Sequence, residues 1–179
     1  MLDKVEKILI DEEKLRNRIR EMGRQITEDY RGKDLIVICI LKGAILFTSD
    51  LVKEIKLPLS IDFMAVSSYG TSTKSSGVVR ILKDLDEEIE GRHVLIVEDI
   101  VDSGLTLNYL TENLLSRKPA SLKICCCLDK PERRMAPVKV NYVGFNIPDE
   151  FVIGYGLDYA EKYRNLPFIG VLSKDAYQE

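Results

Sequence analysis

Segments with helical spacing alternate along this chain with short, uninterrupted apolar runs. Apolar residues at spacings of four, three, four and four predict a helix with one buried stripe, formed by Leu15, Ile19, Met22, Ile26 and Tyr30. The acids at 11–13 suit the start of that helix, and Gly32 is expected to end it. A second helix is predicted from about Ala44 to Glu54, with an apolar side of Ile45, Leu46, Leu51, Val52 and Ile55. A third is marked by Leu107, Leu110, Leu114 and Leu115.

The uninterrupted runs are typical of strands buried on both faces. They cover residues 35–41, 61–66, 78–82, 94–97 and 122–128. A weaker alternation follows over 138–145, and 147–172 indicates short strands and turns. Because apolar strands alternate with helices, we expect an α/β fold with a mainly parallel central sheet flanked by helices.

Composition narrows the classes of protein further. The 179 residues are 45% hydrophobic and 31% charged, with a net charge of −3, which excludes a disordered or fibrous chain. The weakly acidic balance argues against a nucleic-acid partner. The longest apolar run, 35–41, is too short to cross a bilayer, and the charged N-terminal segment has no apolar signal core. We therefore expect a soluble, cytoplasmic protein without a membrane partner.

Several catalytic and metal sites are excluded by the residues available. The lone histidine, His93, begins an apolar run, so a packing role is favoured over a catalytic triad or a zinc site. Cys39 and the consecutive Cys125, Cys126 and Cys127 contain no C-x-x-C pair and are interpreted as small core residues. Neither GxxxxGK[ST] nor GxGxxG occurs in the chain.

Ligands bind such sheets beyond the carboxyl ends of the parallel strands, so the residues after each strand are candidate site residues. Lys42 and Gly43 follow the first run, and Asp129 and Lys130 follow a later one. Residues 67–77 hold five serines, two threonines and two glycines without an aliphatic anchor. A loop this long is uncommon without a function, so we expect a mobile loop near the site.

The segment after residues 94–97 carries the strongest chemical signal. Two adjacent acids, Glu98 and Asp99, precede two apolar residues and then Asp-Ser-Gly-Leu-Thr at 102–106, which opens a helix. Backbone N–H groups at a helix start, hydroxyls and a glycine make a phosphate cradle. Acids beside it suit sugar hydroxyls, a divalent cation or a developing positive charge. The alternative, loop acids with Asp102 as a helix N-cap, does not explain three acids and a glycine at this spacing.

This segment resembles the phosphoribosyl-pyrophosphate signature of type I phosphoribosyltransferases. The likeness extends from about residue 35 to 172 and is closest in order and spacing to the bacterial branch acting on hypoxanthine and guanine. It is carried by Leu41-Lys42-Gly43, Ser68-Tyr69, Asp129-Lys130-Pro131, Val143-Gly144-Phe145, the stretch 151–159 and Arg164.

The resemblance implies a single phosphoribosyltransferase domain over 1–179, with a core of about 15–128 and a small hood formed by about 1–14 and 129–179. It implies a purine-salvage enzyme that transfers the 5-phosphoribosyl group from phosphoribosyl pyrophosphate to N9 of a 6-oxopurine, hypoxanthine or guanine. The products would be IMP or GMP and pyrophosphate, the cofactor magnesium (Mg2+), and the assembly a homodimer or homotetramer.

The same resemblance implies a role for each matching residue. Asp102 would be catalytic and would take or share the proton displaced as N9 attacks. Phosphoribosyl pyrophosphate would be bound by Leu41, Lys42, Gly43, Ser68, Tyr69, Glu98, Asp99, Asp102, Ser103, Gly104, Leu105, Thr106 and Arg164. The base site would comprise Lys130, donating to O6, with Phe151, Val152 and Asp158; the metal ligands would be Glu98, Asp99 and Asp158.

Two details qualify the match. The Leu41–Lys42 peptide is often cis in this family, which would aim an amide N–H at an anion. Many relatives carry lysine where this chain has Leu105. We expect little loss of phosphate binding from that change, because backbone amides supply most of it.

Two rival functions remain on the same fold. An RNA-binding regulator would need a basic face, but Arg16, Arg18, Arg20 and Arg24 alternate with Glu12, Glu13, Glu21 and Glu28. An adenine phosphoribosyltransferase would not place a lysine donor against an exocyclic amine, so Lys130 argues against it. The preference among hypoxanthine, guanine and xanthine stays open.

Overall fold

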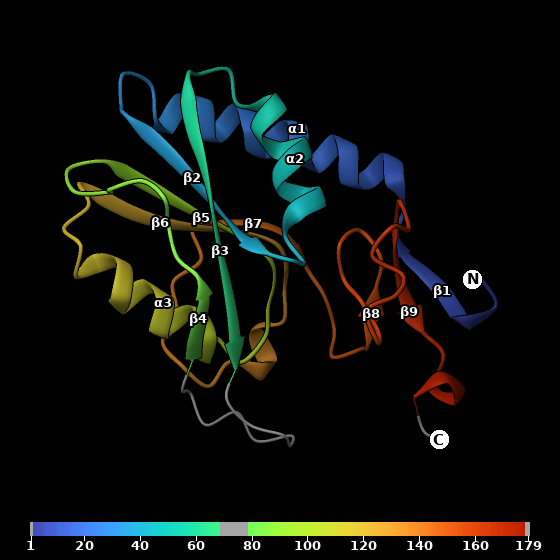
Figure 1. Ribbon diagram of the computed structural model, residues 1–179. Helices are drawn as coiled ribbons and strands as arrows, with labels where there is room; N and C mark the ends of the chain where they lie inside the picture. The colour runs from blue at the N-terminus through green and yellow to red at the C-terminus, as the bar shows by residue number, and fades with distance from the viewer. Residues whose placement is uncertain (1, 69–78, 178–179) are drawn as a thin grey trace.

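A computed structural model describes residues 2–68 and 79–177 of the chain (Figure 1). The helices within this part are α1 (Glu12–Asp29), α2 (Ile45–Glu54) and α3 (Leu105–Leu115), with short 3-10 turns η1 (Leu2–Lys4), η2 (Pro131–Arg133) and η3 (Lys174–Ala176). The strands are β1 (Val5–Ile10), β2 (Leu35–Leu41), β3 (Leu59–Ser68), β4 (Val79–Lys83), β5 (His93–Val101), β6 (Ser121–Asp129), β7 (Tyr142–Asn146), β8 (Val152–Ile153) and β9 (Ile169–Leu172).

The larger sheet has the strand order β4-β3-β2-β5-β6-β7. Its neighbouring strands are parallel except for β4, which pairs antiparallel with β3 at the edge. Helices α1 and α2 cover one face of this sheet and α3 covers the other (Figure 1). The α/β class and the mainly parallel sheet are confirmed.

Strand β2 shows why its apolar run is uninterrupted. Leu35 and Val37 pack into the core under α1 and α2, whereas Ile36, Ile38 and Ile40 pack into the core under α3. Consecutive residues of a strand point to opposite faces, so a strand covered on both sides must be apolar at every position.

Helix α1 follows its predicted stripe, since all five apolar members are buried. Asp11 caps the start, because its carboxylate accepts a hydrogen bond from the backbone N–H of Lys14 at 2.8 Å. The helix ends at Asp29, three residues before Gly32, which takes a positive φ of 76° in the turn that follows.

The predicted apolar side of α2 was wrong in part. The helix buries Phe47, Thr48 and Leu51, whereas Ile45 and Leu46 are each 37% exposed. Phe47 and Leu51 lie four residues apart on one face of the helix, and this face is turned toward the core. Ile45 and Leu46, the two residues before Phe47, therefore point outward.

Strand β5 is longer than expected, and this changes where the acids lie. The predicted strand ended at Val97, but the ladder with β6 continues to the pair Val101–Asp129. Glu98 and Asp99 are therefore part of the strand, and only Asp102 lies beyond it. Strand β3 is also longer than its predicted span, and β7 begins four residues later than position 138.

A second sheet joins the two ends of the described chain. It has the order β1-β9-β8, and both of its pairs are antiparallel. It lies to one side of the larger sheet (Figure 1). The sequence analysis predicted no strand over β1, because only Ile10 in its mixed VEKILI sequence is buried.

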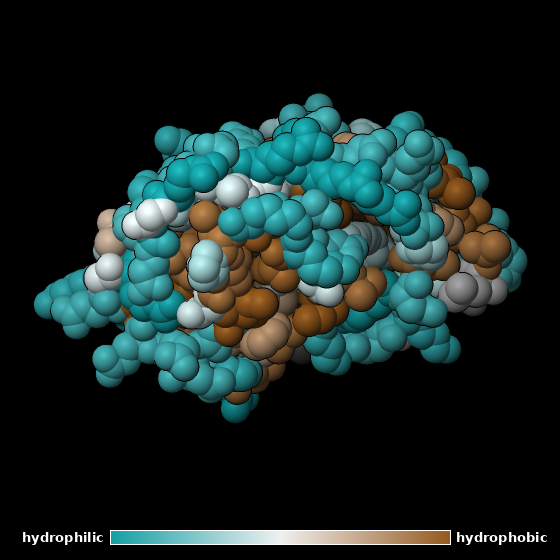
Figure 2. Space-filling view, turned by 90° about the horizontal axis from the view of Figure 1, so that it is seen from above, coloured by the Kyte–Doolittle hydropathy of each residue, from teal (hydrophilic) through white to brown (hydrophobic). Residues whose placement is uncertain are grey.

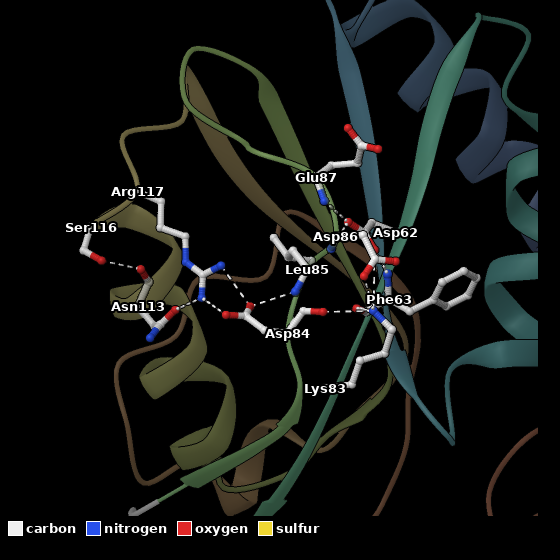
Figure 3. A network of polar contacts seen from close by, with 10 residues as sticks. All are labelled: Asp62, Phe63, Lys83, Asp84, Leu85, Asp86, Glu87, Asn113, Ser116 and Arg117. Carbon is white, nitrogen blue, oxygen red and sulfur yellow. Dashed lines mark hydrogen bonds and ion pairs between the residues drawn. The ribbon is translucent and has the colours of Figure 1, made fainter.

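A buried carboxylate holds the connection between β4 and β5. Asp62, on β3, is 2% exposed, and its Oδ2 accepts hydrogen bonds from the backbone N–H groups of Asp86 and Glu87, both at 2.9 Å (Figure 3). Lys83 adds hydrogen bonds to the carbonyl oxygens of Phe63 and Asp84. The network fixes the acidic segment that leads into β5.

We expect Asp62→Ala to lower the free energy of unfolding by about 2 kcal/mol, because two part-buried N–H groups lose their acceptor. For a chain of this size the Tm should fall by roughly 4–8 °C in a thermal melt. The matched control Asp86→Ala, at an exposed carboxylate, should stay within about 0.5 kcal/mol of the parent. Equal melting of Asp62→Ala and the parent would contradict this role.

Candidate active site

The carboxyl ends of the parallel strands bring several predicted site residues to one edge of the sheet. Lys42 and Gly43 follow β2, the 102–106 turn follows β5, and Lys130 follows β6. The last two are joined by a hydrogen bond of 2.9 Å from the Lys130 N–H to the carbonyl of Val101. The segment after β8 reaches the same edge, since a Cβ placed on Gly156 would lie 2.0 Å from the carbonyl oxygen of Gly43.

The 102–106 turn links β5 directly to α3. Gly104 is the N-cap residue and takes a left-handed conformation with φ of 79°, which a side chain would strain. Gly104 has no side chain to cap α3, and the hydroxyl of Ser103 accepts a hydrogen bond from the N–H of Leu105 at 3.3 Å. Backbone N–H groups at the start of a helix form an anion site, so this turn could hold a phosphate. The sequence analysis predicted this arrangement of strand, glycine turn and open helix start.

The two strand acids lie on opposite faces of β5, as consecutive residues do. Burial, together with the charge of Asp99, raises the pKa of Glu98 well above its usual range. Burial also raises the pKa of Asp99 to about 6, although the N–H of Ile100 and the charge of Arg164 act in the opposite direction. A cation brought to this edge would favour the ionised form of both acids.

The donor set fits a magnesium ion, although it forms no protein cage. In the part of the chain that is described, no three acids, cysteines or histidines are grouped as a metal site. Asp158 is close enough to raise the pKa of Asp99, whereas Glu98 faces the other side of the sheet. Magnesium commonly uses one or two carboxylates together with substrate phosphates and water, so Asp99 and Asp158 are the carboxylates that would hold it.

The β2–α2 connection is packed tightly against these acids. The Leu41–Lys42 peptide is cis. A Cβ on Gly43 would lie 1.7 Å from Oδ2 of Asp99, so only glycine fits there without moving the carboxylate. The Lys42 ammonium is paired with Glu161 at 2.8 Å.

Arg164 completes this end of the site from the segment between β8 and β9. Its guanidinium donates to the carbonyl of Gly156 at 2.7 Å and contacts Asp158 at 3.3 Å and Glu161 at 3.1 Å. The structure therefore joins Lys42, Asp158 and Arg164 through Glu161, a residue that the sequence analysis did not select.

Three of the predicted base-binding residues, Lys130, Phe151 and Val152, lie close to one another, whereas Asp158 is paired with Arg164. Lys130 is 7% exposed, and its ammonium donates to the carbonyl of Glu150 at 2.8 Å. Phe151, the residue after Glu150, is 41% exposed. One contact of its ring is a stack on Tyr177 with centroids 5.2 Å apart, and another is the edge of Tyr159 at 5.8 Å. Val152 begins β8 and is buried.

Asp102 begins the 102–106 turn and contacts two arginines that follow Lys130 in the chain. Its carboxylate accepts a hydrogen bond from Nε of Arg133 at 2.6 Å, and its carbonyl accepts one from Arg134 at 3.0 Å. Arg134 also pairs with Asp129 at 2.6 Å. Both arginines lie just beyond the Asp-Lys-Pro motif, after Glu132, and that position was the available signal for them. Tyr177, near the chain end, had none.

Three further predictions concern the serine-rich loop, the single histidine and the cysteines. Tyr69 and most of the 67–77 loop lie outside the described residues, and Ser68 ends β3. His93 lies at the opposite edge of the sheet, where its Nδ1 is 2.7 Å from the hydroxyl of Ser121. The cysteines are buried and unpaired, and burial raises the pKa of each.

A hollow of about 520 Å³ lies elsewhere, between α1, α2 and residues 165–167. Its lining mixes acids and bases such as Asp50 and Arg16 and includes none of the predicted site residues. The chemistry-bearing residues are therefore concentrated at the strand ends.

Comparison with known proteins identifies the family of the chain. A model of the family described as "Phosphoribosyl transferase domain" matches residues 7–160. The chain is 55% identical to hypoxanthine-guanine phosphoribosyltransferase of Mycobacterium avium, over 98% of this chain and 89% of that protein. It is 54% identical to the enzyme of the same name from Bacillus subtilis, over 97% of both. A crystal structure of hypoxanthine phosphoribosyltransferase from Staphylococcus aureus superposes with a TM-score of 0.97 at 52% identity, covering 99% of this chain and 96% of that one.

Proposed function

Because the chain belongs to the phosphoribosyl transferase family, we propose that the carboxyl edge of its larger sheet is the active site of a purine-salvage enzyme. The enzyme transfers the 5-phosphoribosyl group of phosphoribosyl pyrophosphate to N9 of hypoxanthine or guanine. IMP or GMP and pyrophosphate are the products.

One observation carries the assignment of the site. The glycine turn at 102–106 and the buried Lys130 are adjacent, joined through the backbone hydrogen bond between Lys130 and Val101. A phosphate held at the turn and a purine held by the lysine would therefore meet over Asp102, which lies between them. The anomeric carbon of the sugar and N9 of the base would then be neighbours.

The phosphoribosyl side is assigned to three groups of residues. The backbone amides and hydroxyls of Ser103, Gly104, Leu105 and Thr106 hold the 5′-phosphate. Glu98 faces the ribose hydroxyls, and Leu41, Lys42, Gly43 and Arg164 meet pyrophosphate. Ser68 and Tyr69 are assigned to phosphoribosyl pyrophosphate by resemblance alone, and Tyr69 lies outside the described residues. Asp99 and Asp158 would hold magnesium, which when bound offsets the negative charge that grows on the leaving pyrophosphate.

The purine side is assigned to residues that follow β6 and precede β8. Lys130 has three donors and turns one of them toward O6 of the base. The exposed ring of Phe151 stacks on the purine, and the backbone of Val152 reads its other edge. Asp158 lies at the boundary between this site and the pyrophosphate.

The proposed chemistry is a displacement at C1′ of the ribose. The bond to pyrophosphate breaks ahead of attack by N9, so the sugar develops positive charge that nearby carboxylates stabilise. Asp102 takes or shares the proton displaced from the purine. Closure of the site keeps water from capturing the sugar.

The test of this function is nucleotide formation by the purified chain from phosphoribosyl pyrophosphate, magnesium and each of hypoxanthine, guanine, xanthine and adenine. We expect product from hypoxanthine and guanine and little from adenine. Lys130→Ala should lower kcat/KM for hypoxanthine by about tenfold or more without the same loss for adenine, because a charge-assisted donor to O6 is removed.

The matched control is Lys33→Ala, at an exposed lysine in the turn before β2, and it should retain the parent's activity. A parent that makes neither IMP nor GMP overturns the function. A Lys130→Ala enzyme that keeps the parent's preference for 6-oxo over 6-amino purines overturns the role of this lysine alone.

We also propose that the chain assembles as a homodimer or homotetramer and works in the cytoplasm. Apolar surface gathers at the centre of the face seen in Figure 2, bordered by polar residues. Ile45 and Leu46 of α2 are exposed large apolar residues, and so is Ile61 of β3 at 44%. Among the helices of the described residues, none has the length and apolar character needed to cross a membrane.

Light scattering at micromolar concentration tests the assembly. The expected molar mass is two or four times the 20.4 kDa of one chain. A mass of one chain under these conditions would contradict the proposal.

A further inference from the structure

Arg133 lies between two carboxylates at the purine end of the site. Its Nε donates to Oδ1 of Asp102 at 2.6 Å, and its Nη1 donates to Oδ2 of Asp149 at 3.1 Å. The other oxygen of Asp149 is 3.6 Å from the ammonium of Lys130. We infer that Arg133 is a positioning residue that fixes the Asp102 carboxylate for proton transfer, an inference that rests on the proposed function.

The backbone of the Asp102 turn is held without Arg133. The carbonyl of Asp102 accepts a hydrogen bond from Arg134, and the carbonyl of Ser103 accepts N–H groups from Met135 at 2.8 Å and Ala136 at 3.2 Å. Removing the Arg133 side chain therefore leaves the turn in place. What it releases is the rotation of the Asp102 carboxylate about its side-chain bonds.

The pair leaves the reactive oxygen free. Within the described residues, Oδ1 of Asp102 has Arg133 as its side-chain partner and Oδ2 has no hydrogen bond. A carboxylate held by one oxygen presents the other in a fixed direction, which a proton acceptor requires. Because guanidinium has donors and no acceptor, Arg133 cannot take the proton and acts through Asp102.

Asp149, the second carboxylate, prevents Arg133 from neutralising the charge of Asp102, the proposed proton acceptor. Arg133 is shared by Asp102 and Asp149, so the three side chains together retain one negative charge. The same sharing connects Asp102 to Lys130 through Asp149. Binding of the purine O6 by Lys130 is thereby coupled to the position of the Asp102 carboxylate, which would face the imidazole ring of the purine.

The test measures kcat and KM for hypoxanthine and for phosphoribosyl pyrophosphate in Arg133→Ala and Arg133→Lys. We expect Arg133→Ala to lower kcat by about tenfold, with each KM within about threefold of the parent. Arg133→Lys should fall between the two enzymes, because it keeps the charge but loses the two directed N–H donors. Arg31→Ala, which removes an exposed arginine paired with Glu28 on α1, is the matched control and should match the parent.

Asp102→Asn supplies the decisive comparison. It should lower kcat by about 10²-fold or more, because it removes the proton acceptor itself. If Arg133 acts through Asp102, adding Arg133→Ala to Asp102→Asn should lower kcat by no more than about twofold further. A role in folding or in overall charge would instead lower kcat by the same factor in both backgrounds.

The outcomes separate the two proposals. A parent inactive on every base refutes the proposed function. An active parent with Asp102→Asn impaired and Arg133→Ala unchanged refutes the inference alone. An additive loss in the double variant, or an Arg133→Ala defect confined to KM, also refutes it. If Asp102→Asn keeps the kcat of the parent, both the proton-transfer role of Asp102 and the positioning role of Arg133 are refuted.

Discussion

The rest of this structure depends on two partly buried carboxylates at the end of a central strand. Strand β5 is apolar on both faces up to Val97, and Glu98 and Asp99 follow in partly buried positions where desolvation raises the pKa of each. Cations surround the edge, but each is engaged with an acid, as in Lys42 with Glu161, Arg164 with Asp158, Arg133 with Asp102 and Arg134 with Asp129. An anionic substrate and its metal must therefore displace these ion pairs in order to bind. The edge thus favours ligands that can replace the lost contacts, and its side chains change partners when such a ligand binds.

The segment after β8 also contributes to this edge. A Cβ on Gly156 would lie 2.0 Å from the carbonyl oxygen of Gly43, and a Cβ on Gly43 would lie 1.7 Å from Oδ2 of Asp99, so neither position accepts a side chain without movement of its neighbour. The pyrophosphate end of the site is thus built from three segments far apart in the sequence. Gly156 follows β8 of the small sheet, in which β1, from the beginning of the chain, pairs with β9 near its end.

Much of the fold could be predicted because local patterns determine it. The stripe of α1 and the run of β2 are covered by the sheet or by helices, so apolar spacing reports burial. The extension of β5 to Val101 could not be predicted, because the ladder with β6 continues through charged residues. Strand β1 depends on pairing with β9 and has little apolar pattern. The outward direction of Ile45 could not be predicted either, because it depends on which side chains of α2 are buried in the core. Phe47 is the main one.

The site was predictable where a motif lies in one segment and less so where partners come from afar. The glycine turn and its acids were identified from spacing, whereas Glu161, Arg133 and Tyr177 emerged only from tertiary contacts. The central claim is that the turn after β5 seats the 5′-phosphate. A crystal structure with a non-reactive analogue of phosphoribosyl pyrophosphate and magnesium tests it most directly. The account predicts phosphate density against the amides of 103–106 with C1′ facing Asp102; a sugar phosphate bound elsewhere, with that turn empty, would contradict it.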